Sequence, residues 1–242
     1  MAVSNRDGIH LHGPIKNKVK KGGVRQWMSD LPIESNPDLC VYMNDFIASQ
    51  DYAAADWTIN TTEEGLGSAT EAIAADEKYG ALVITNDDAE NDVDSLQMSE
   101  ENWKLESGKQ VWMEMRLKVL DVANADLFVG LAITDTTPRD ASDKVGFLLA
   151  DESAALSCLN TKDTTSTTTA SIATLVADTY VKLGFHWDGK SKIEYFVNRA
   201  LVATHSTNVP DDENLAVTLN IQNGAAAANV LTVDYIYVAQ ER

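Results

Sequence analysis

Residues 111–120 read VWMEMRLKVL. Valine, methionine and leucine fill every second position, while Glu114, Arg116 and Lys118 lie between them. A hydrophobic period of two is the pattern of a β-strand with one buried face. This stretch therefore predicts a strand that packs one face against a core.

Comparable runs recur along the chain, separated by Asp, Asn, Gly, Ser, Thr and Pro. They cover residues 39–43, 81–85, 127–134, 145–149, 180–187, 193–197, 201–203, 215–221 and 231–238. Seven or more short strands with such punctuation predict an all-β protein, an antiparallel β-sandwich or jelly roll.

Two segments differ from this pattern. Residues 68–76 are short and Ala-rich and predict the one helix in the middle of the chain. The Thr-rich run 164–169 predicts a hairpin loop or an edge strand rather than a glycosylated stalk, because threonine favours strands. A single short helix does not support alternating strands and helices around a parallel sheet.

Charge divides the chain into two parts. Residues 1–30 hold six basic and two acidic residues, a formal charge of +4, so that thirteen basic and 35 acidic residues give the remainder −22. We expect a basic, extended N-terminal arm with a linker at 1–36 and one β-domain at 37–242. The arm would pack on its own acidic domain, or reach a neighbouring subunit or another acidic surface.

The net charge of −18 argues against nucleic-acid binding through the body of the protein. No stretch of 18 uncharged apolar residues is present, so we expect neither a membrane span nor a secretory leader. Cys40 and Cys158 have no metal-ligand spacing, and we expect both to be reduced and buried.

An acidic cluster follows the run at 81–85. Its carboxylates could hold Ca²⁺, which prefers oxygen ligands, although their spacing is not that of an EF-hand loop and a solvated loop is the plain alternative. The cluster consists of Asp87, Asp88, Glu90, Asp92 and Asp94. A second acidic group consists of Asp135, Asp140 and Asp143. The neighbouring Arg139 and Lys144 could neutralise its negative charge.

Histidines and tryptophans are the other candidates for chemistry. His10 and His12 in the arm share one side of an extended chain and could bind a metal or an acidic partner. We expect His186 to be a surface residue and His205 to end a strand. The tryptophans could stack on sugar rings or, as large rings usually do, belong to the core; they are Trp27, Trp57, Trp103, Trp112 and Trp187.

Motifs of nucleophilic hydrolysis and nucleotide binding are missing. The sequence has no Gly-x-Ser-x-Gly elbow and no Walker loop, and Gly65-Leu66-Gly67 lacks the third glycine of a dinucleotide fingerprint. These absences favour a protein without catalytic activity.

Residues 180–189 (YVKLGFHWDG), 193–198 (IEYFVN) and 231–238 (LTVDYIYV) resemble the closing strands of concanavalin A-like lectin and glucanase jelly rolls. Residues 112–120 and 127–134 resemble that family's paired central strands. Laminarinase-type members carry Glu-x-Asp-x-x-Glu or Glu-x-Asp-x-Glu on one strand. Here the equivalent stretch has no carboxylate between Asp126 and Asp135, so the resemblance implies a binding or structural module rather than a hydrolase.

A jelly roll with a basic arm also resembles the capsid decoration, or cement, proteins of tailed bacteriophages. The resemblance implies a non-enzymatic protein made in the host cytoplasm and bound to the capsid surface of the virion, a homo-oligomer with a trimer among its expected states. Its partners would be the major capsid protein and copies of itself. The expected attachment residues are His10, His12, Lys16, Lys18, Lys20, Lys21, Arg25 and Trp27.

Two alternatives remain open. One is a carbohydrate-binding, lectin-like module on a phage fibre or surface, using a sheet face and calcium at residues 87–94. The other is a glycoside hydrolase with an unconventional pair of acids.

Overall fold

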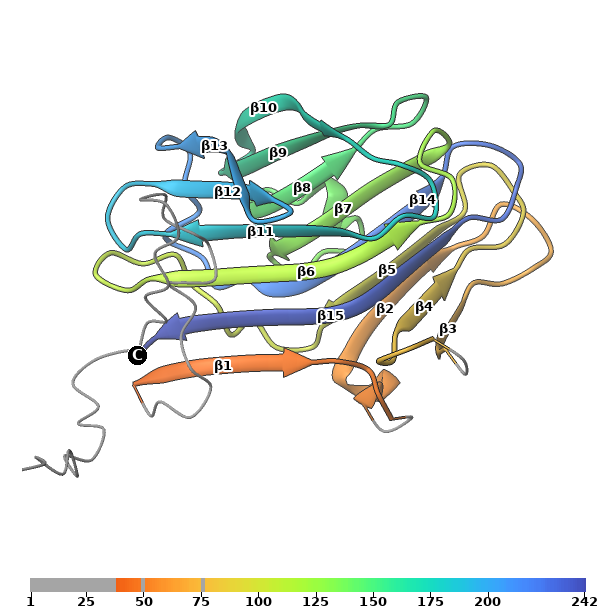
Figure 1. The fold of residues 1–242 in the computed structure, drawn as a ribbon, viewed down its shortest axis with the longest axis horizontal. Helices are drawn as coiled ribbons and strands as arrows, with labels where there is room; N and C mark the ends of the chain where they lie inside the picture. Colours follow the sequence, from red (N-terminus) through yellow and green to blue (C-terminus); the bar gives the residue numbers. More distant parts are fainter. Residues whose placement is uncertain (1–37, 49–50, 75–76) are drawn as a thin grey trace, which may run out of the picture.

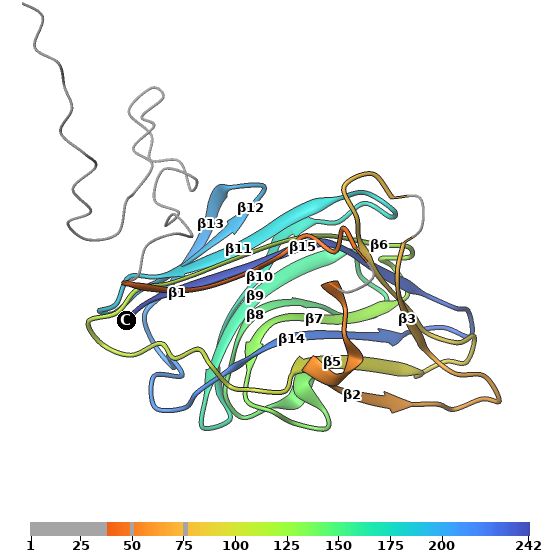
Figure 2. The same cartoon turned by 90° about the horizontal axis from the view of Figure 1, so that it is seen from below.

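The computed structural model describes residues 38–48, 51–74 and 77–242, which form two antiparallel sheets packed face to face (Figures 1 and 2). The eight-stranded sheet runs β13 (Ala200–His205), β12 (Ile193–Val197), β11 (Val181–Trp187), β6 (Val111–Val119), β15 (Val230–Glu241), β4 (Leu82–Thr85) and β3 (Thr70–Ile73), with β1 (Leu39–Asn44) also paired to β15. The seven-stranded sheet runs β10 (Thr165–Thr174), β9 (Ala155–Lys162), β8 (Lys144–Leu149), β7 (Ala125–Ala132), β14 (Ala216–Asn223), β5 (Val93–Met98) and β2 (Trp57–Thr62). The predicted antiparallel sandwich of the concanavalin A-like type is confirmed.

Strand β6 shows how the sequence pattern becomes the core. Met113, Met115 and Leu117 point between the sheets and are fully buried, whereas Glu114 and Arg116 point to the outer face. Burial of each such side chain stabilises the fold by roughly 1.5–3 kcal/mol. The single large core between the sheets is built in this way from both inner faces.

Strand β15 organises one side of the sandwich. It pairs with β6 along one edge, and along its other edge with β4 at residues 230–233 and with β1 at residues 236–241. Strands β1 and β3 therefore lie at the margin of their sheet on the side where β2 ends the opposite sheet (Figure 1). The pocket described below lies along this margin.

The helix predicted at residues 68–76 is wrong. Residues 70–73 form β3, which pairs with β4 in the register Glu71↔Ile84 and Ile73↔Leu82. The edge of β4 offers backbone hydrogen bonds, and Glu71 and Ile73 alternate toward the inner side, so tertiary pairing overrides the local Ala content. The Thr-rich run lies in β10, an edge strand, as predicted.

The proposed pairing of residues 112–120 with 127–134 is also wrong. These stretches form β6 and β7, which lie in opposite sheets. The connection between them, including Leu120 and Asn124, crosses from one sheet to the other. Alternation identifies a strand, but it does not identify the strand with which it pairs.

Within the described residues the remaining elements are two short 3-10 helices, η3 (Ala54–Asp56) and η4 (Pro138–Asp140). No helix in this part of the chain has the length and apolar character needed to cross a membrane.

Candidate binding pocket and the acidic end of the sandwich

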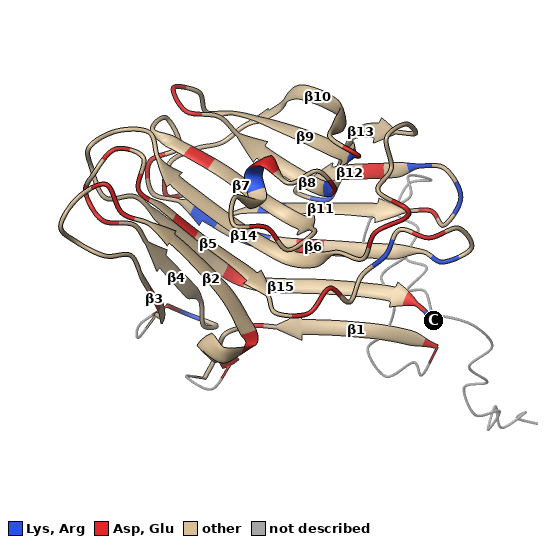
Figure 3. Cartoon of the chain, turned by 180° about the vertical axis from the view of Figure 1, so that it is seen from behind, with Lys and Arg blue, Asp and Glu red and all other residues tan. Residues whose placement is uncertain are grey.

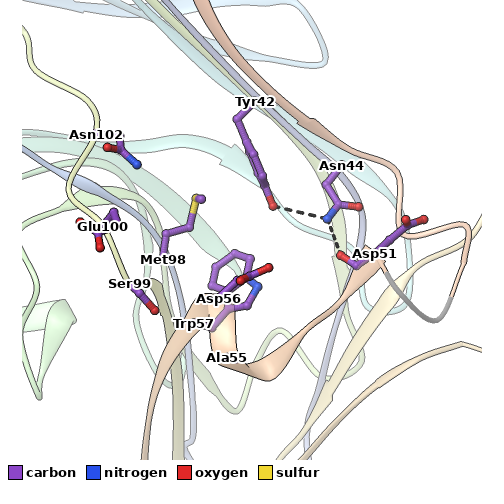
Figure 4. A pocket seen from close by; sticks show the side chains of 10 residues that line it. All are labelled: Tyr42, Asn44, Asp51, Ala55, Asp56, Trp57, Met98, Ser99, Glu100 and Asn102. Atoms are coloured by element: carbon purple, nitrogen blue, oxygen red, sulfur yellow. Dashed lines mark hydrogen bonds between the residues drawn. The ribbon is translucent and has the colours of Figure 1, made fainter.

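A pocket of about 500 Å³ opens at the margin where β1 faces the start of β2 (Figure 4). Its walls come from β1, the segment leading through η3 into β2, and the end of β5 with the residues after it. The lining residues are Tyr42, Asn44, Asp51, Ala55, Asp56, Trp57, Met98, Ser99, Glu100 and Asn102.

The rim of this pocket is held by hydrogen bonds around Asn44. Its Nδ2 donates to the Asp51 carbonyl oxygen at 2.6 Å, and its Oδ1 accepts from the Phe46 backbone N–H at 2.9 Å. Asp51 Oδ2 accepts from the Ala48 N–H at 2.7 Å. One amide and one carboxylate thus fix the chain that leaves β1, so the pocket is largely preformed.

The chemistry of the lining suits a polyhydroxylated ligand. Tyr42 lies beside the apolar Trp57 and Met98, while Asp51, Asp56 and Glu100 supply carboxylate oxygens. Burial raises the pKa of Tyr42, the Asp56 charge raises it further, and a hydrogen bond from Asn44 partly offsets both. The phenol therefore stays protonated as a donor, and a lining without Lys or Arg favours neutral or cationic ligands over anions.

Strand β7 is the one on which the laminarinase pattern of carboxylates is missing, and its outer face is covered by the segment that follows it. Residues 133–143 lie against it: Gln97 Nε2 donates to the Ile133 carbonyl at 3.0 Å, and Ala141 packs in a cluster with Phe128. The one carboxylate of β7, Asp126, forms an ion pair of 2.5 Å with Arg139. This strand therefore offers no pair of carboxylates for glycoside hydrolysis.

Cys158, His205 and Asn160 come together in space although the sequence gives no sign of it. Cys158 Sγ lies 4.0 Å from His205 Nε2, and His205 Nδ1 lies 2.7 Å from Asn160 Oδ1. Thr169 Oγ1 lies 2.8 Å from the same Nε2 and is its hydrogen-bond partner. Burial raises the pKa of the Cys158 thiol to about 12 and lowers that of His205, so this trio is a buried polar contact and lacks the accessible thiolate of a nucleophile.

The prediction of a surface position for His186 is wrong. Its side chain points to the outer face of β11, but it is only 6% exposed because its ring stacks on Trp112 at 5.2 Å between centroids. His186 Nε2 also lies 3.0 Å from Gln110 Oε1. Stacking on a fully buried indole removes the ring from solvent.

The described tryptophans are buried, as expected for core rings: Trp57, Trp103, Trp112 and Trp187 are at most 6% exposed. Trp57 also lines the pocket. Both cysteines are free, with Cys158 buried and Cys40 partly exposed.

The acidic run at 87–94 is divided by the structure. Asp87 and Asp92 lie with Glu63, their oxygens within 4.8 Å of one another, and Asp88 and Glu90 are exposed outside this group. Asp94 points instead to the inner face, opposite Thr61 and Ile221. The acidic loops gather at the left end of the sandwich in Figure 3.

The second acidic group does not converge. Asp143 accepts hydrogen bonds from Ser142 Oγ and the Asp163 N–H, and Lys144 Nζ donates to the Arg139 carbonyl. In the described ranges, Glu63, Asp87 and Asp92 form the one group of three acidic, His or Cys side chains with ligand atoms this close. All eight attachment residues predicted in the arm, His10 to Trp27, lie outside the described residues.

Comparison of the sequence with protein-family models and with curated proteins finds no match. The fold is similar to an endo-1,3-β-glucanase from Streptomyces sioyaensis, with a TM-score of 0.63, 12% identity, and 87% of this chain and 99% of that chain covered. It is also similar to the carbohydrate recognition domain of Emp46p in its metal-free form (TM-score 0.52, 10% identity, 80% and 93% covered). A carbohydrate esterase of the Shiga toxin-encoding bacteriophage phi24B is a third relative in fold (TM-score 0.52, 13% identity, 83% and 97% covered).

These likenesses define the class: the chain has a concanavalin A-like jelly roll, the fold of glucanases and lectin-type domains. At 10–13% identity they establish the fold alone.

Proposed function

We propose that this protein is a non-enzymatic virion structural protein of the capsid-decoration type, which binds and stabilises a phage head through its basic N-terminal arm. The observation that carries the proposal is the separation of charge: +4 over residues 1–30 and −22 over the rest. An acidic sandwich is repelled by acidic surfaces, whereas a basic arm is attracted to them.

Two features of the sandwich support a structural role. The outer face of β7 is covered by residues 133–143 and lacks a carboxylate pair. An extended arm adds contacts at low entropic cost when its partner lattice is already ordered. The partners would be the major capsid protein and further copies of this chain on the virion surface, in a homo-oligomer such as a trimer.

The arm is tested by binding to phage heads that lack the protein. Deletion of residues 1–26, and separately the variant with Lys16, Lys18, Lys20 and Lys21 changed to Gln, should abolish co-sedimentation. The variant Lys190→Gln/Lys192→Gln removes exposed charges from the sandwich and should bind as wild type. Undiminished binding by the arm variants would reject the proposal.

The pocket favours a second candidate, a carbohydrate-binding module on a phage fibre or surface. Tyr42 and Trp57 beside three carboxylates and two amides form the kind of lining that binds sugar rings and hydroxyls. Glycan-array binding that is lost in Tyr42→Ala and Glu100→Gln, and kept in Glu152→Gln at the β8–β9 connection, would support this function. No binding to any glycan would count against it and leave the decoration role untouched.

A further inference from the structure

The outer face of the eight-stranded sheet has an opening of about 420 Å³ where β11, β6 and β15 are neighbours (Figure 1). In the strand register, Arg116 of β6 lies between Lys182 of β11 and Tyr235 of β15. Cross-strand neighbours on one face lie about 5 Å apart at Cβ, so these side chains form one row. Lys78 and Tyr79, from the connection between β3 and β4, also line the opening. Cationic and aromatic side chains therefore meet here, on a sandwich that is otherwise strongly acidic.

An irregularity in β15 shapes the row. The register of β15 against β6 shifts between Val233 and Tyr235, so Asp234 is an extra residue and both it and Tyr235 line the opening. Bulges of this kind re-aim side chains and are frequent beside functional sites. Asp234 forms an ion pair with Arg116 Nη1, and the Arg116 guanidinium carbon lies 3.8 Å from the centre of the Tyr180 ring. Arg116 is thus fixed in place, and its other N–H groups remain as donors.

Both acidic side chains of the opening are already engaged. Glu77 accepts a hydrogen bond from Tyr180 Oη at 2.5 Å, and Asp234 has its ion pair with the guanidinium. Among the ion pairs of the described residues, none includes Lys78 or Lys182. The opening therefore has two ammonium groups whose charge no carboxylate of the described chain neutralises by direct contact.

Positive charge is crowded around the half-buried Lys182. Burial lowers its pKa, and the charges of Arg199 and Arg116 lower it further, while Glu114 and Asp234 act in the opposite direction. Charges that are partly removed from water are weakly screened from one another. An anion bound beside this ammonium group would relieve the repulsion.

Tyr79 presents an aromatic ring at the same opening. It is 69% exposed, and its backbone has a φ of +79°, which is unusual for a bulky side chain. Lys78 Nζ lies 4.8 Å from the centre of the ring. Backbone strain of this kind is often kept where a side chain serves a ligand. An exposed ring beside a cation suits a ligand that combines a ring with negative charge.

We propose that this opening binds a phosphate monoester, with the phosphate held by Lys78 and Lys182 and the ring of the ester against Tyr79. Such a phosphate carries a charge of about −1.5 to −2 at neutral pH, which matches two ammonium groups, whereas a carboxylate would neutralise one. The remaining donors of Arg116 suit phosphate oxygens. Sugar phosphates and nucleoside monophosphates share this chemistry. The proposal is independent of the arm and of the pocket beside β1.

The test is calorimetry on the full chain in a phosphate-free buffer, with AMP, glucose 6-phosphate and glucuronate as probes. At least one of the two esters should bind, roughly tenfold or more tightly than the monoanionic glucuronate, and the tighter ester identifies a nucleotide or a sugar as the source of the phosphate. Its affinity should fall as NaCl is raised. Failure of both esters to bind, or equal binding of glucuronate, would overturn the proposal.

Variants of the lining separate the site from the fold. Lys78→Gln and Lys182→Gln should each weaken ester binding roughly tenfold with an unchanged Tm, and Lys190→Gln, an exposed lysine between β11 and β12, should bind as wild type. Tyr79→Gly tolerates the positive φ, so it should keep the Tm while its affinity for the ester falls to that for inorganic phosphate. Wild-type affinity in both lysine variants would reject the site, and wild-type affinity in Tyr79→Gly would reject the place of the ring.

Discussion

Cys158 Sγ lies 4.0 Å from His205 Nε2 at a point where both side chains are buried between β9 and β13. The contact has the residue types of a thiol nucleophile and its base. It lacks solvent access, and burial holds the pKa of the thiol at about 12, above its ordinary 9.0. A thiolate is therefore rare at neutral pH, and the pair stabilises the fold rather than reacting.

The first prediction is that Cys158 resists alkylation. In the Cys40→Ala variant, iodoacetamide at pH 8 should leave Cys158 unmodified in the native protein and should label it after unfolding in urea. In the Cys158→Ala variant, the partly exposed Cys40 should be labelled in the native state. Because the folded pKa lies above the unfolded value of 9.0, the thiol's contribution to stability is complete below that pH and declines as the pH rises toward 12. Rapid native labelling of Cys158, confirmed by mass spectrometry, would contradict its burial.

Local patterns predicted most of the strands but not their arrangement. Strands β6, β11 and β15 were found because their inner residues alternate, and that periodicity survives folding. Strands β2, β5 and β9 were not predicted. In β5, Val93-Asp94-Ser95-Leu96-Gln97-Met98 mixes polar residues into both faces, and four of its six residues are nevertheless buried.

The candidate sites were less predictable than the fold. The sequence places Asp87 and Asp92 close together, but Glu63 lies 24 residues before Asp87 and no local signal joins it to them. The same applies to the pocket, where Tyr42 of β1 and Glu100, which follows β5, line one opening although β1 and β5 belong to different sheets. Contacts between sheets depend on strand order, which the hydrophobic period leaves open.

A second prediction concerns the glycines beside the acidic group. Gly67→Ala would place a Cβ 1.8 Å from Asp87 Oδ2 and so displace that carboxylate, whereas Gly65→Ala meets Ala89 Cβ at 3.3 Å and needs only a small shift. Gly67→Ala should therefore lower the Tm measured by thermal unfolding, and Gly65→Ala should leave it within roughly 2 °C of the wild type. Equal Tm values for the two variants would show that the Asp87 carboxylate can move aside without cost.

A third prediction concerns Glu114 on the outer face of β6. Arg199 Nε and Nη2 donate to its two oxygens at 3.1 and 3.0 Å, and Tyr235 Oη donates at 2.5 Å. The Glu114 side chain is 4% exposed, so Arg199→Met should leave a buried carboxylate without its ion-pair partner and cost roughly 3 kcal/mol in urea unfolding. Adding Glu114→Gln should recover part of this loss, and a double variant no more stable than Arg199→Met would argue against the ion pair as the cause.

The last prediction separates the shape of the pocket from its chemistry. Asn44→Ala removes the 2.6 Å hydrogen bond to the Asp51 carbonyl and the acceptor for the Phe46 N–H, so it should lower the free energy of unfolding by roughly 1–2 kcal/mol and loosen the rim. Asp56→Asn keeps the volume of an exposed lining side chain and should leave the stability unchanged.

If the pocket binds a glycan, both variants should weaken the binding measured by calorimetry. Asn44→Ala would do so through lost preorganisation, and Asp56→Asn through a lost carboxylate acceptor. Asp88→Asn, outside the pocket, is the control for charge; loss of binding in that variant, or wild-type affinity in both pocket variants, would place the ligand elsewhere on the sandwich.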